Sequence, residues 1–240
     1  MKLRCDIHTH TIASGHAYGT MREMAEEAAG RNLSLIGFSE HGPGTPGTCD
    51  PFHFAAIDKV PRTLHGVHVI HGCEINVMND GVLHLEKRWL KKLDYAIIGI
   101  HTVCFQDEGA EKNTEQLIAC MKHPKVFFIS HPDDSKTPLD YEMLVKAAKD
   151  LHVALEVNNS SFLKKSRLNR DDNYRTMLAL CAQHQVPIIV SSDAHDPSWV
   201  GVFDDAIAFL EQEHFPEELI LTRDEHRVYE FIGLDESIFR

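Results

Sequence analysis

Short apolar runs alternate with amphipathic segments along most of this 240-residue chain. Runs rich in β-branched residues predict strands; they cover residues 3–8, 35–38, 67–75, 95–100, 126–130, 153–157 and 187–191. Apolar residues spaced three and four apart predict helices, at residues 21–29, 111–121, 141–149, 173–183, 202–212 and 224–232. Strands that alternate with helices indicate a parallel sheet, so the pattern predicts an α/β fold.

The spacing of these units fits both an open doubly wound sheet and a closed barrel. The polar residues that follow the strands separate the two. Each predicted strand ends in ligand-type side chains: His8 and His10, Glu40 and His41, Glu74, His101, His131, Asn158 and Asn159, Asp193 and His195. An open sheet gathers functional residues at a switch point between a few strands, whereas a barrel brings every strand end to one rim. We therefore expect a seven-stranded (β/α)7 barrel with its site at the C-terminal rim.

Composition and charge narrow the class of protein. No linker, low-complexity tract or run of like charge divides the sequence, so residues 1–240 are expected to form one domain. The net charge of −12 and the lack of a basic stripe argue against a nucleic-acid partner. No apolar run approaches the roughly 20 residues of a membrane span, and no signal core is evident. We expect a cytoplasmic protein, with its six scattered cysteines reduced.

Histidine is in excess, with 17 in the chain, and two pairs have the spacing of metal ligands. His8 and His10 in DIHTH lie two positions apart at a strand end, so they face the same way and can share an ion. Asp193 and His195 repeat that spacing in SSDAH. Imidazole and carboxylate without thiolate suit Zn, Mn or Fe. At roughly three to four protein ligands per ion, the strand-end residues suffice for three divalent ions. Their charge would attract a phosphate monoester.

The ordered motifs DIHTH, SGHAYGT, SEHGP, GCEIN, GIH, SHP, EVNNSS and SSDAH resemble those of the PHP (polymerase and histidinol phosphatase) superfamily, in particular its compact bacterial phosphatases of YcdX type. The resemblance implies a distorted seven-stranded β/α barrel with a trinuclear, usually zinc, centre and suggests a homotrimer. It assigns His8, His10, Glu74 and Asp193 to one ion, His16, His41 and His195 to the second, and His101, His131 and the bridging Glu74 to the third. His16 rests on the resemblance alone.

Several other residues are candidates for supporting roles. Asp6 has the strand parity of His8, so it either orients a ligand or lies inside the barrel, and Glu40 is expected to support the site or the fold. Asn158 and Asn159 end the sixth strand and are candidates for substrate contact. His71 and Cys73 have the opposite parity to Glu74 and are expected to point away from the site.

A basic cluster follows the sixth strand and consists of Lys164, Lys165, Arg167 and Arg170. It either faces solvent at a helix start or contacts phosphate, and we take Arg167 as the candidate for substrate binding. Asp133 and Asp134 stand where many relatives have a Gly-Asn turn, and they are expected to add negative charge near the rim.

Together these features predict a metal-dependent phosphatase that hydrolyses small-molecule phosphate monoesters, with a metal-activated hydroxide as nucleophile. The nucleophile motif G-x-S-x-G and the phosphate-binding loop G-x-x-x-x-G-K-[ST] are absent. Two alternatives stay open. One is a phosphodiesterase or exonuclease that acts on nucleic-acid ends, and the other is a non-catalytic metal-binding protein on the same barrel.

Overall fold

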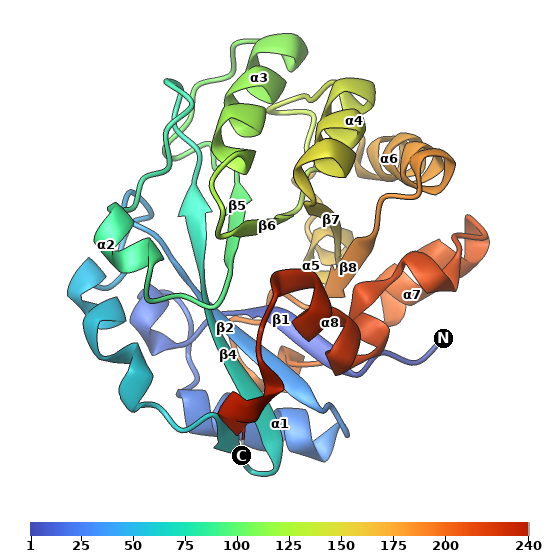
Figure 1. Ribbon diagram of the computed structural model, residues 1–240. Coiled ribbons are helices and arrows are strands. Elements are labelled where there is room, and N and C mark those ends of the chain that lie inside the picture. The colour runs from blue at the N-terminus through green and yellow to red at the C-terminus, as the bar shows by residue number, and fades with distance from the viewer. Residues whose placement is uncertain (240) are drawn as a thin grey trace.

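The computed structural model describes residues 1–239, and its centre is a curved parallel sheet of seven strands (Figure 1). Along the sheet the strands are β1 (Cys5–Thr9), β2 (Leu35–His41), β4 (Val67–Asn76), β5 (Ala96–Gly99), β6 (Val126–Ile129), β7 (Ala154–Asn158) and β8 (Ile188–Ser191). This order confirms the predicted seven-stranded barrel. A two-residue strand that was not predicted, β3 (Thr63–Leu64), pairs antiparallel with β4.

The two edge strands, β1 and β8, meet at the C-terminal rim. There His10 N donates to Ala194 O at 2.8 Å, and Thr9 forms a bridge with Ala194. At the other end the segment around Thr222 lies between the two strands: Arg4 N donates to Thr222 O at 3.0 Å, and Val190 N donates to Thr222 Oγ1 at 3.0 Å. The barrel is therefore closed at the rim and spread apart at its base. This opening at the base is what distorts the barrel.

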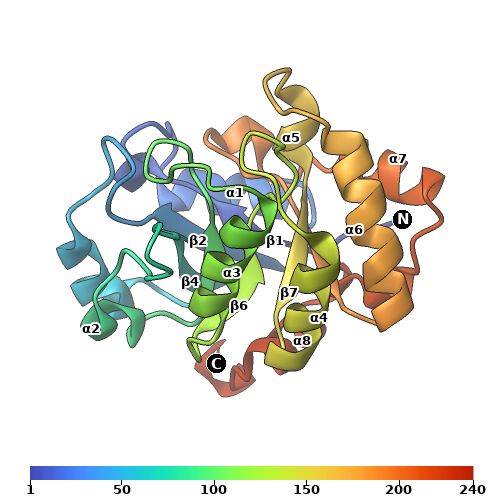
Figure 2. The same ribbon diagram turned by 90° about the horizontal axis from the view of Figure 1, so that it is seen from above.

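Helices surround the sheet (Figure 2). Six correspond to predicted segments: α1 (Met21–Gly30), α3 (Ala110–Met121), α4 (Tyr141–Leu151), α6 (Arg170–His184), α7 (Asp204–Gln212) and α8 (Glu225–Ile232). Two short helices were not predicted, α2 (Lys87–Leu90) and α5 (Asn159–Leu163). The 3-10 helices are η1 (Ile12–Ser14), η2 (Pro51–Lys59), η3 (Pro197–Trp199), η4 (Glu217–Leu219), η5 (Leu221–Arg223) and η6 (Glu236–Phe239). Within residues 1–239 no helix is both long and apolar enough to cross a bilayer.

The connection between β2 and β4 departs from strict β/α alternation. It contains η2 in place of an α-helix, because Asp50 caps Phe52 N and the buried Phe54 and Ile57 lie three positions apart. Three-residue spacing places both side chains on one face of a 3-10 helix, whereas an α-helix needs apolar residues over a longer span.

The barrel interior is apolar at its base and polar at its rim, and Tyr95 lies at the boundary. Its hydroxyl donates to Ile7 O at 2.6 Å. Gly37 and Gly72 make room for the ring, since a Cβ at either position would lie 2.4 Å from a Tyr95 atom. Two residues beyond Gly72, on the same face of β4, comes the buried Glu74. Below Tyr95, residues of α8 help to fill the base, at the opposite end of the sheet from α5 (Figure 2).

Candidate metal centre

The rim brings together the nine side chains that the resemblance names as metal ligands. Within residues 1–239 the potential ligand atoms form three groups, and inside each group all atoms lie within 4.8 Å of one another. The groups are His8, His10 and Asp193; His10, His41 and His195; and His41, Glu74 and His101. His131 joins through Glu74. His16 reaches the cluster from the loop after η1, where its ring centroid lies 4.8 Å from that of His41 and 5.0 Å from that of His195.

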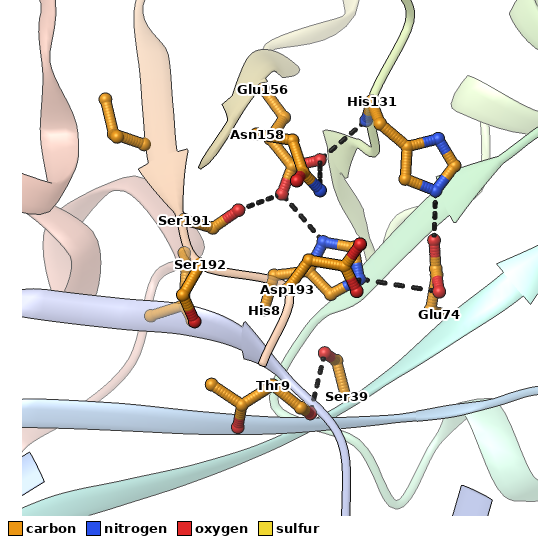
Figure 3. A network of polar contacts seen from close by, with 12 residues as sticks. His8, Thr9, Ser39, Glu74, His131, Glu156, Asn158, Ser191, Ser192 and Asp193 are labelled. Carbon is orange, nitrogen blue, oxygen red and sulfur yellow. Dashed lines mark hydrogen bonds and ion pairs between the residues drawn. The ribbon is translucent and has the colours of Figure 1, made fainter. Parts of the chain in front are cut away.

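Glu74 is the centre of this arrangement. Its Oε2 lies 2.9 Å from His41 Nδ1 and 3.4 Å from His8 Nε2. Its Oε1 lies 3.0 Å from His131 Nε2 and 3.2 Å from His101 Nε2. Figure 3 shows Glu74 between His8 and His131. Because the two oxygens face different imidazoles, one carboxylate can bridge two ions.

Asp193 and His131 enter the site through an unusual backbone conformation. Both have positive φ, 54° for Asp193 and 28° for His131, and each lies two residues after the last residue of a strand. Such values are strained for residues other than glycine and persist where the surrounding structure enforces them. The turn brings Asp193 Oδ1 to 3.3 Å from His10 Nε2 and 3.7 Å from His8 Nε2.

The charges around the site favour a cation. Burial alone would raise the pKa of Glu74, yet the imidazoles of His101, His8 and His41 hold it well below its usual range. Asp193 behaves likewise, because Lys164 and His8 outweigh its burial and keep its pKa low. In the same way, Glu156 and Glu74 outweigh the burial of His8 and raise its pKa. A positive charge between these groups is thus stabilised.

The atoms that face the centre are buried donors and acceptors that lack hydrogen-bond partners. They are His8 Nε2, His10 Nε2, His41 Nδ1 and both carboxylate oxygens of Glu74, none of which finds a hydrogen-bond partner within residues 1–239. Leaving such atoms unpaired costs roughly 1–3 kcal/mol each. Divalent ions would pair them, and the set of imidazoles and carboxylates has the chemistry that Zn, Mn and Fe accept. The residues therefore fit the implied metal centre.

In His8 and His101 one ring nitrogen is already occupied, which turns the other nitrogen toward the centre. His8 Nδ1 lies 2.7 Å from Glu156 Oε1, and His101 Nδ1 lies 2.7 Å from Asn76 Oδ1. Metal-binding histidines are commonly fixed in this way, because the partner sets both tautomer and ring orientation. Sequence reasoning missed Glu156 and Asn76. Each lies two positions from a residue that it did select, Asn158 and Glu74, and so shares its face of the strand.

Glu156 does more than hold His8. It is fully buried on β7, and it accepts hydrogen bonds from His131 N at 2.6 Å, from Asn158 Nδ2 at 3.1 Å and from the Ser191 hydroxyl (Figure 3). One carboxylate thus ties β6, β7 and β8 to the candidate ligand from β1. The position of the site depends on this residue, although it contacts no other candidate ligand side chain.

The comparisons with known proteins agree with this geometry. The sequence matches the family model described as the PHP domain over residues 6–185. The chain belongs to the PHP domain family. This PHP domain is 39% identical over 233 residues to a protein named "Probable phosphatase" from Clostridium botulinum (strain Okra / Type B1), and the match covers 97% of this chain and 95% of that protein.

Two solved structures share the fold of this PHP domain. One is the histidinol phosphate phosphatase of Lactococcus lactis subsp. lactis Il1403 complexed with zinc, L-histidinol and phosphate, with a TM-score of 0.62, 17% identity, and 89% of this chain and 94% of that chain covered. The other belongs to a structure of archaeal ribonuclease P with mature tRNA, with a TM-score of 0.61, 17% identity, and 96% and 90% covered. At these identities the likeness concerns the fold.

Asp6 and Glu40, the predicted supporting carboxylates, contact no candidate ligand side chain directly. The register of β1 against β2 shifts between Asp6 and Thr9. Asp6 instead accepts hydrogen bonds from Ser192 N at 3.1 Å and Gly201 N at 2.8 Å. It therefore supports the segment that carries Asp193.

Glu40 acts through Ser14, which sequence reasoning did not select. The Ser14 hydroxyl donates to Glu40 Oε2 at 2.6 Å, and its oxygen lies 3.3 Å from His10 Nδ1 and accepts from His41 N at 3.0 Å. Ser14 is the first residue of the motif SGHAYGT, but it sits in η1, away from the strand ends, and sequence reasoning gave it no role.

The predicted substrate-binding asparagines turn toward the protein. Asn158 donates to Glu156 and caps α5, where its Oδ1 accepts from Ser161 N at 3.3 Å. Asn159 is buried, and its Oδ1 accepts from Ala206 N at 3.0 Å. These bonds fix the start of α5 and connect it to α7.

The two added aspartates near the rim do not present free charge. Asp133 is buried, lies 3.1 Å from the donating Ser161 hydroxyl and 3.6 Å from Arg167 Nη1, and burial raises its pKa to about 6. Arg167 also lies 4.0 Å from Asp134. Burial and the Arg167 guanidinium together lower the pKa of His131 to about 4, so this imidazole is neutral near pH 7, as a metal ligand must be.

His71 and Cys73 lie away from the centre, as their strand parity predicted. Cys73 packs in the apolar layer outside the strands. His71 is buried against Phe38, with ring centroids 6.3 Å apart.

Proposed function

We propose that this PHP domain is a metal-dependent phosphomonoesterase that acts on small molecules and holds three divalent ions, zinc first and manganese or iron as alternatives. The observation that carries the proposal is the group of buried ligand atoms around Glu74 that have no hydrogen-bond partner among the described residues. The phosphatase names of relatives at 36–39% identity support it. So does the zinc, histidinol and phosphate complex of the structural neighbour.

The residues that would hold the ions are those that the resemblance assigned. His8, His10, Glu74 and Asp193 would hold one, His16, His41 and His195 the second, and His101 and His131 with Glu74 the third. Bound ions of this kind lower the pKa of water and stabilise charge on phosphate oxygens. In the overall reaction water adds to phosphorus and the ester P–O bond breaks, so that the products are an alcohol and inorganic phosphate.

The chain's own contribution is to fix the ligands before substrate arrives. Glu156 and Asn76 hold the rings of His8 and His101 with the metal-facing nitrogen directed inward. Ser14 does the same for His10 and holds the backbone of His41. All these groups are buried or nearly so, which keeps bulk water from competing for the ligand atoms.

Small-molecule substrates are proposed rather than nucleic-acid ends because of the charge of the chain. The chain carries a net charge of −12, and the cations that approach the centre are largely paired with Asp133, Asp134 and Asp193. A strand of nucleic acid needs several free cations along a groove. The expected homotrimer and the cytoplasmic location stay predictions.

The proposal is tested by metal removal and restoration. Protein stripped with a chelator should hydrolyse no aryl phosphate, and activity should return when Zn or Mn is added, with about three ions bound per chain by elemental analysis. Circular dichroism before and after stripping controls for unfolding. Folded, metal-loaded protein that turns over no member of a phosphoester panel would contradict the proposal and favour the non-catalytic alternative. Release of nucleotides from single-stranded DNA, without monoester hydrolysis, would favour the exonuclease.

A further inference from the structure

One side of the candidate metal centre opens into a pocket of about 400 Å³, called here the Trp199 pocket. Three candidate ligands form part of its wall: His16, Asp193 and His195. The remaining lining residues are Asn159, Ser160, Leu163, Lys164, Ser192 and Trp199. A volume of this size is typical of metabolite-binding pockets. Because the ligands form one wall, a molecule that places its phosphate at the ions would extend its organic group into this pocket.

The apolar part of the lining is incompletely covered by the protein. Leu163 is 50% exposed and Trp199 is 47% exposed, although large apolar side chains are normally stabilised by burial. An indole with an open face is well suited to stack on a flat ring. Both residues therefore offer apolar surface next to the place where the ester bond would break.

Hydrogen bonds hold the segment that carries Trp199. Asp196 caps η3 by accepting from Ser198 N at 3.0 Å, and Arg31 Nη2 donates to Ser198 O at 3.0 Å. Leu163 lies at the end of α5, whose first turn is capped by Asn158. A ligand that binds between two fixed surfaces loses less free energy to ordering of the protein than one that binds mobile loops.

Lys164 is the single cation of this pocket's lining within residues 1–239. Its Nζ lies 3.2 Å from Asp193 Oδ2, and its side chain is 43% exposed. Two other members of the basic cluster are paired: Arg167 with Asp133, and Arg170 with Asp171 at 2.6 Å. One ammonium at the edge of the centre can contact one phosphate oxygen, but it cannot follow a polymer backbone.

We infer that the Trp199 pocket binds the organic group of the phosphoester, that Leu163 and Trp199 select a flat aromatic group, and that Lys164 binds a phosphate oxygen. The inference rests on the proposed phosphomonoesterase function and narrows its substrates to monoesters of small aromatic alcohols.

Benzyl phosphate and ethyl phosphate test the selection, because their leaving alcohols are similar in acidity and differ in the aromatic ring. The metal-loaded full chain should have the higher kcat/KM for benzyl phosphate. Trp199→Ala should lower that value about tenfold and leave ethyl phosphate within about twofold, and Trp199→Phe should restore most of it. Leu168→Ala, an equally exposed leucine outside the pocket lining, should change neither. If Trp199→Ala lowered kcat/KM equally for both esters, or lowered it for neither, the proposed selection of aromatic groups would be overturned.

Lys164→Met tests the phosphate contact. It should raise KM for both esters and the inhibition constant of inorganic phosphate about tenfold, the equivalent of one charge-assisted contact. The bound metal should stay the same by elemental analysis, and Lys165→Met provides the matched control. Loss of metal in Lys164→Met, or an equal effect of Lys165→Met, would overturn this role. If wild-type protein hydrolyses neither ester with any metal, the proposed function itself fails; hydrolysis that is indifferent to Trp199 and Lys164 removes the pocket assignment alone.

Discussion

At the scale of single residues, the candidate site consists of ligands and of the side chains that hold them. In the proposed assignment Glu74 would join two ions, since one of its oxygens faces His8 and the other faces His131. Glu156 contacts the centre only through His8 and the backbone of His131. Loss of a ligand and loss of such a partner should therefore have different effects, one on the number of bound ions and the other on their affinity.

Glu74→Ala should abolish phosphatase activity and leave a folded barrel. The variant removes the carboxylate shared by the predicted first and third ion positions, so we expect fewer than three ions per chain by elemental analysis. Circular dichroism should match that of the wild type. Retained turnover with the full metal content would contradict the assignment of Glu74 as a bridging ligand.

Glu156→Gln should keep the shape of the side chain but remove the charge that fixes His8. We expect metal affinity to fall about 10–100-fold, measured by competition with a chromophoric chelator. Glu142→Gln changes an exposed carboxylate that pairs with Lys146, and it should leave the affinity unchanged. Equal affinities for the wild type and Glu156→Gln would mean that the Glu156 contact with His8 is incidental.

His71 should make the stability of the metal-free chain depend on pH. Burial, together with Arg62 and His53, lowers its pKa to about 4 against the opposing charge of Asp94. The unfolded chain binds this proton below about pH 6.5, so the contribution of His71 to stability is complete above that value and is lost as the pH falls toward 4. When the pH is lowered from 7.5 to 5, the free energy of unfolding of His71→Leu, measured with urea, should rise by about 2 kcal/mol relative to that of the wild type. A constant difference between the two would contradict the lowered pKa.

These residues also show what the sequence could reveal about the site. The ligand-type residues at the strand ends were visible because each follows an apolar run, and a parallel barrel must bring those ends together. Glu156 lies within β7, where a polar residue has no special meaning until its partner His8 on another strand is known. Asn76 ends β4, but its role depends on a contact with His101, which follows the neighbouring strand β5. Simple alternation does not foresee the register shift of β1 between Asp6 and Thr9, so it could not give the hydrogen-bond partners of Asp6.

At the scale of elements, the barrel separates its apolar base from its polar rim by close packing around Tyr95. The seven strands and six main helices were predictable, since each carries enough periodic apolar residues to define its type. The short helices α2 and α5 and the 3-10 segment η2 were not, because they span too few turns for periodicity to show. Their positions depend on caps such as Asp50 and Asn158.

Gly72→Ala should destabilise the barrel, since the new Cβ would lie 2.4 Å from Tyr95 Cζ. Overpacking of this kind typically costs about 1–3 kcal/mol, measured as a lower free energy of unfolding. Combining it with Tyr95→Leu should cost less than the sum of the two single changes, because the clash is then removed. Gly30→Ala, which meets no atom within 4 Å at the end of α1, should be neutral or slightly stabilising. If the losses of unfolding free energy from Gly72→Ala and Tyr95→Leu were strictly additive, the role given to Tyr95 would be contradicted.

At the scale of the whole molecule, the candidate ligands come from every part of the rim. Those on or directly after β1, β2, β4, β5, β6 and β8 meet at one centre, while β7 contributes Glu156 behind it. The same rim is where β1 and β8 close the barrel. Ions bound there would connect first and last strands, so metal binding and folding of the entire chain should be coupled.

Removal of metal should therefore lower the thermal stability of the whole domain. An ion present at about 1,000 times its dissociation constant stabilises the folded state by about 4 kcal/mol, which for a chain of this size corresponds to about 10 °C in Tm. Differential scanning calorimetry of chelator-treated protein, before and after Zn is restored, measures the shift as a single transition. The Tm of Glu74→Ala should rise less when Zn is restored, since this variant holds fewer ions. If metal changed the activity but left Tm unaltered, the ions would be bound at an accessory site. The prediction that ions at the rim ligands hold the first and last strands together would then be contradicted.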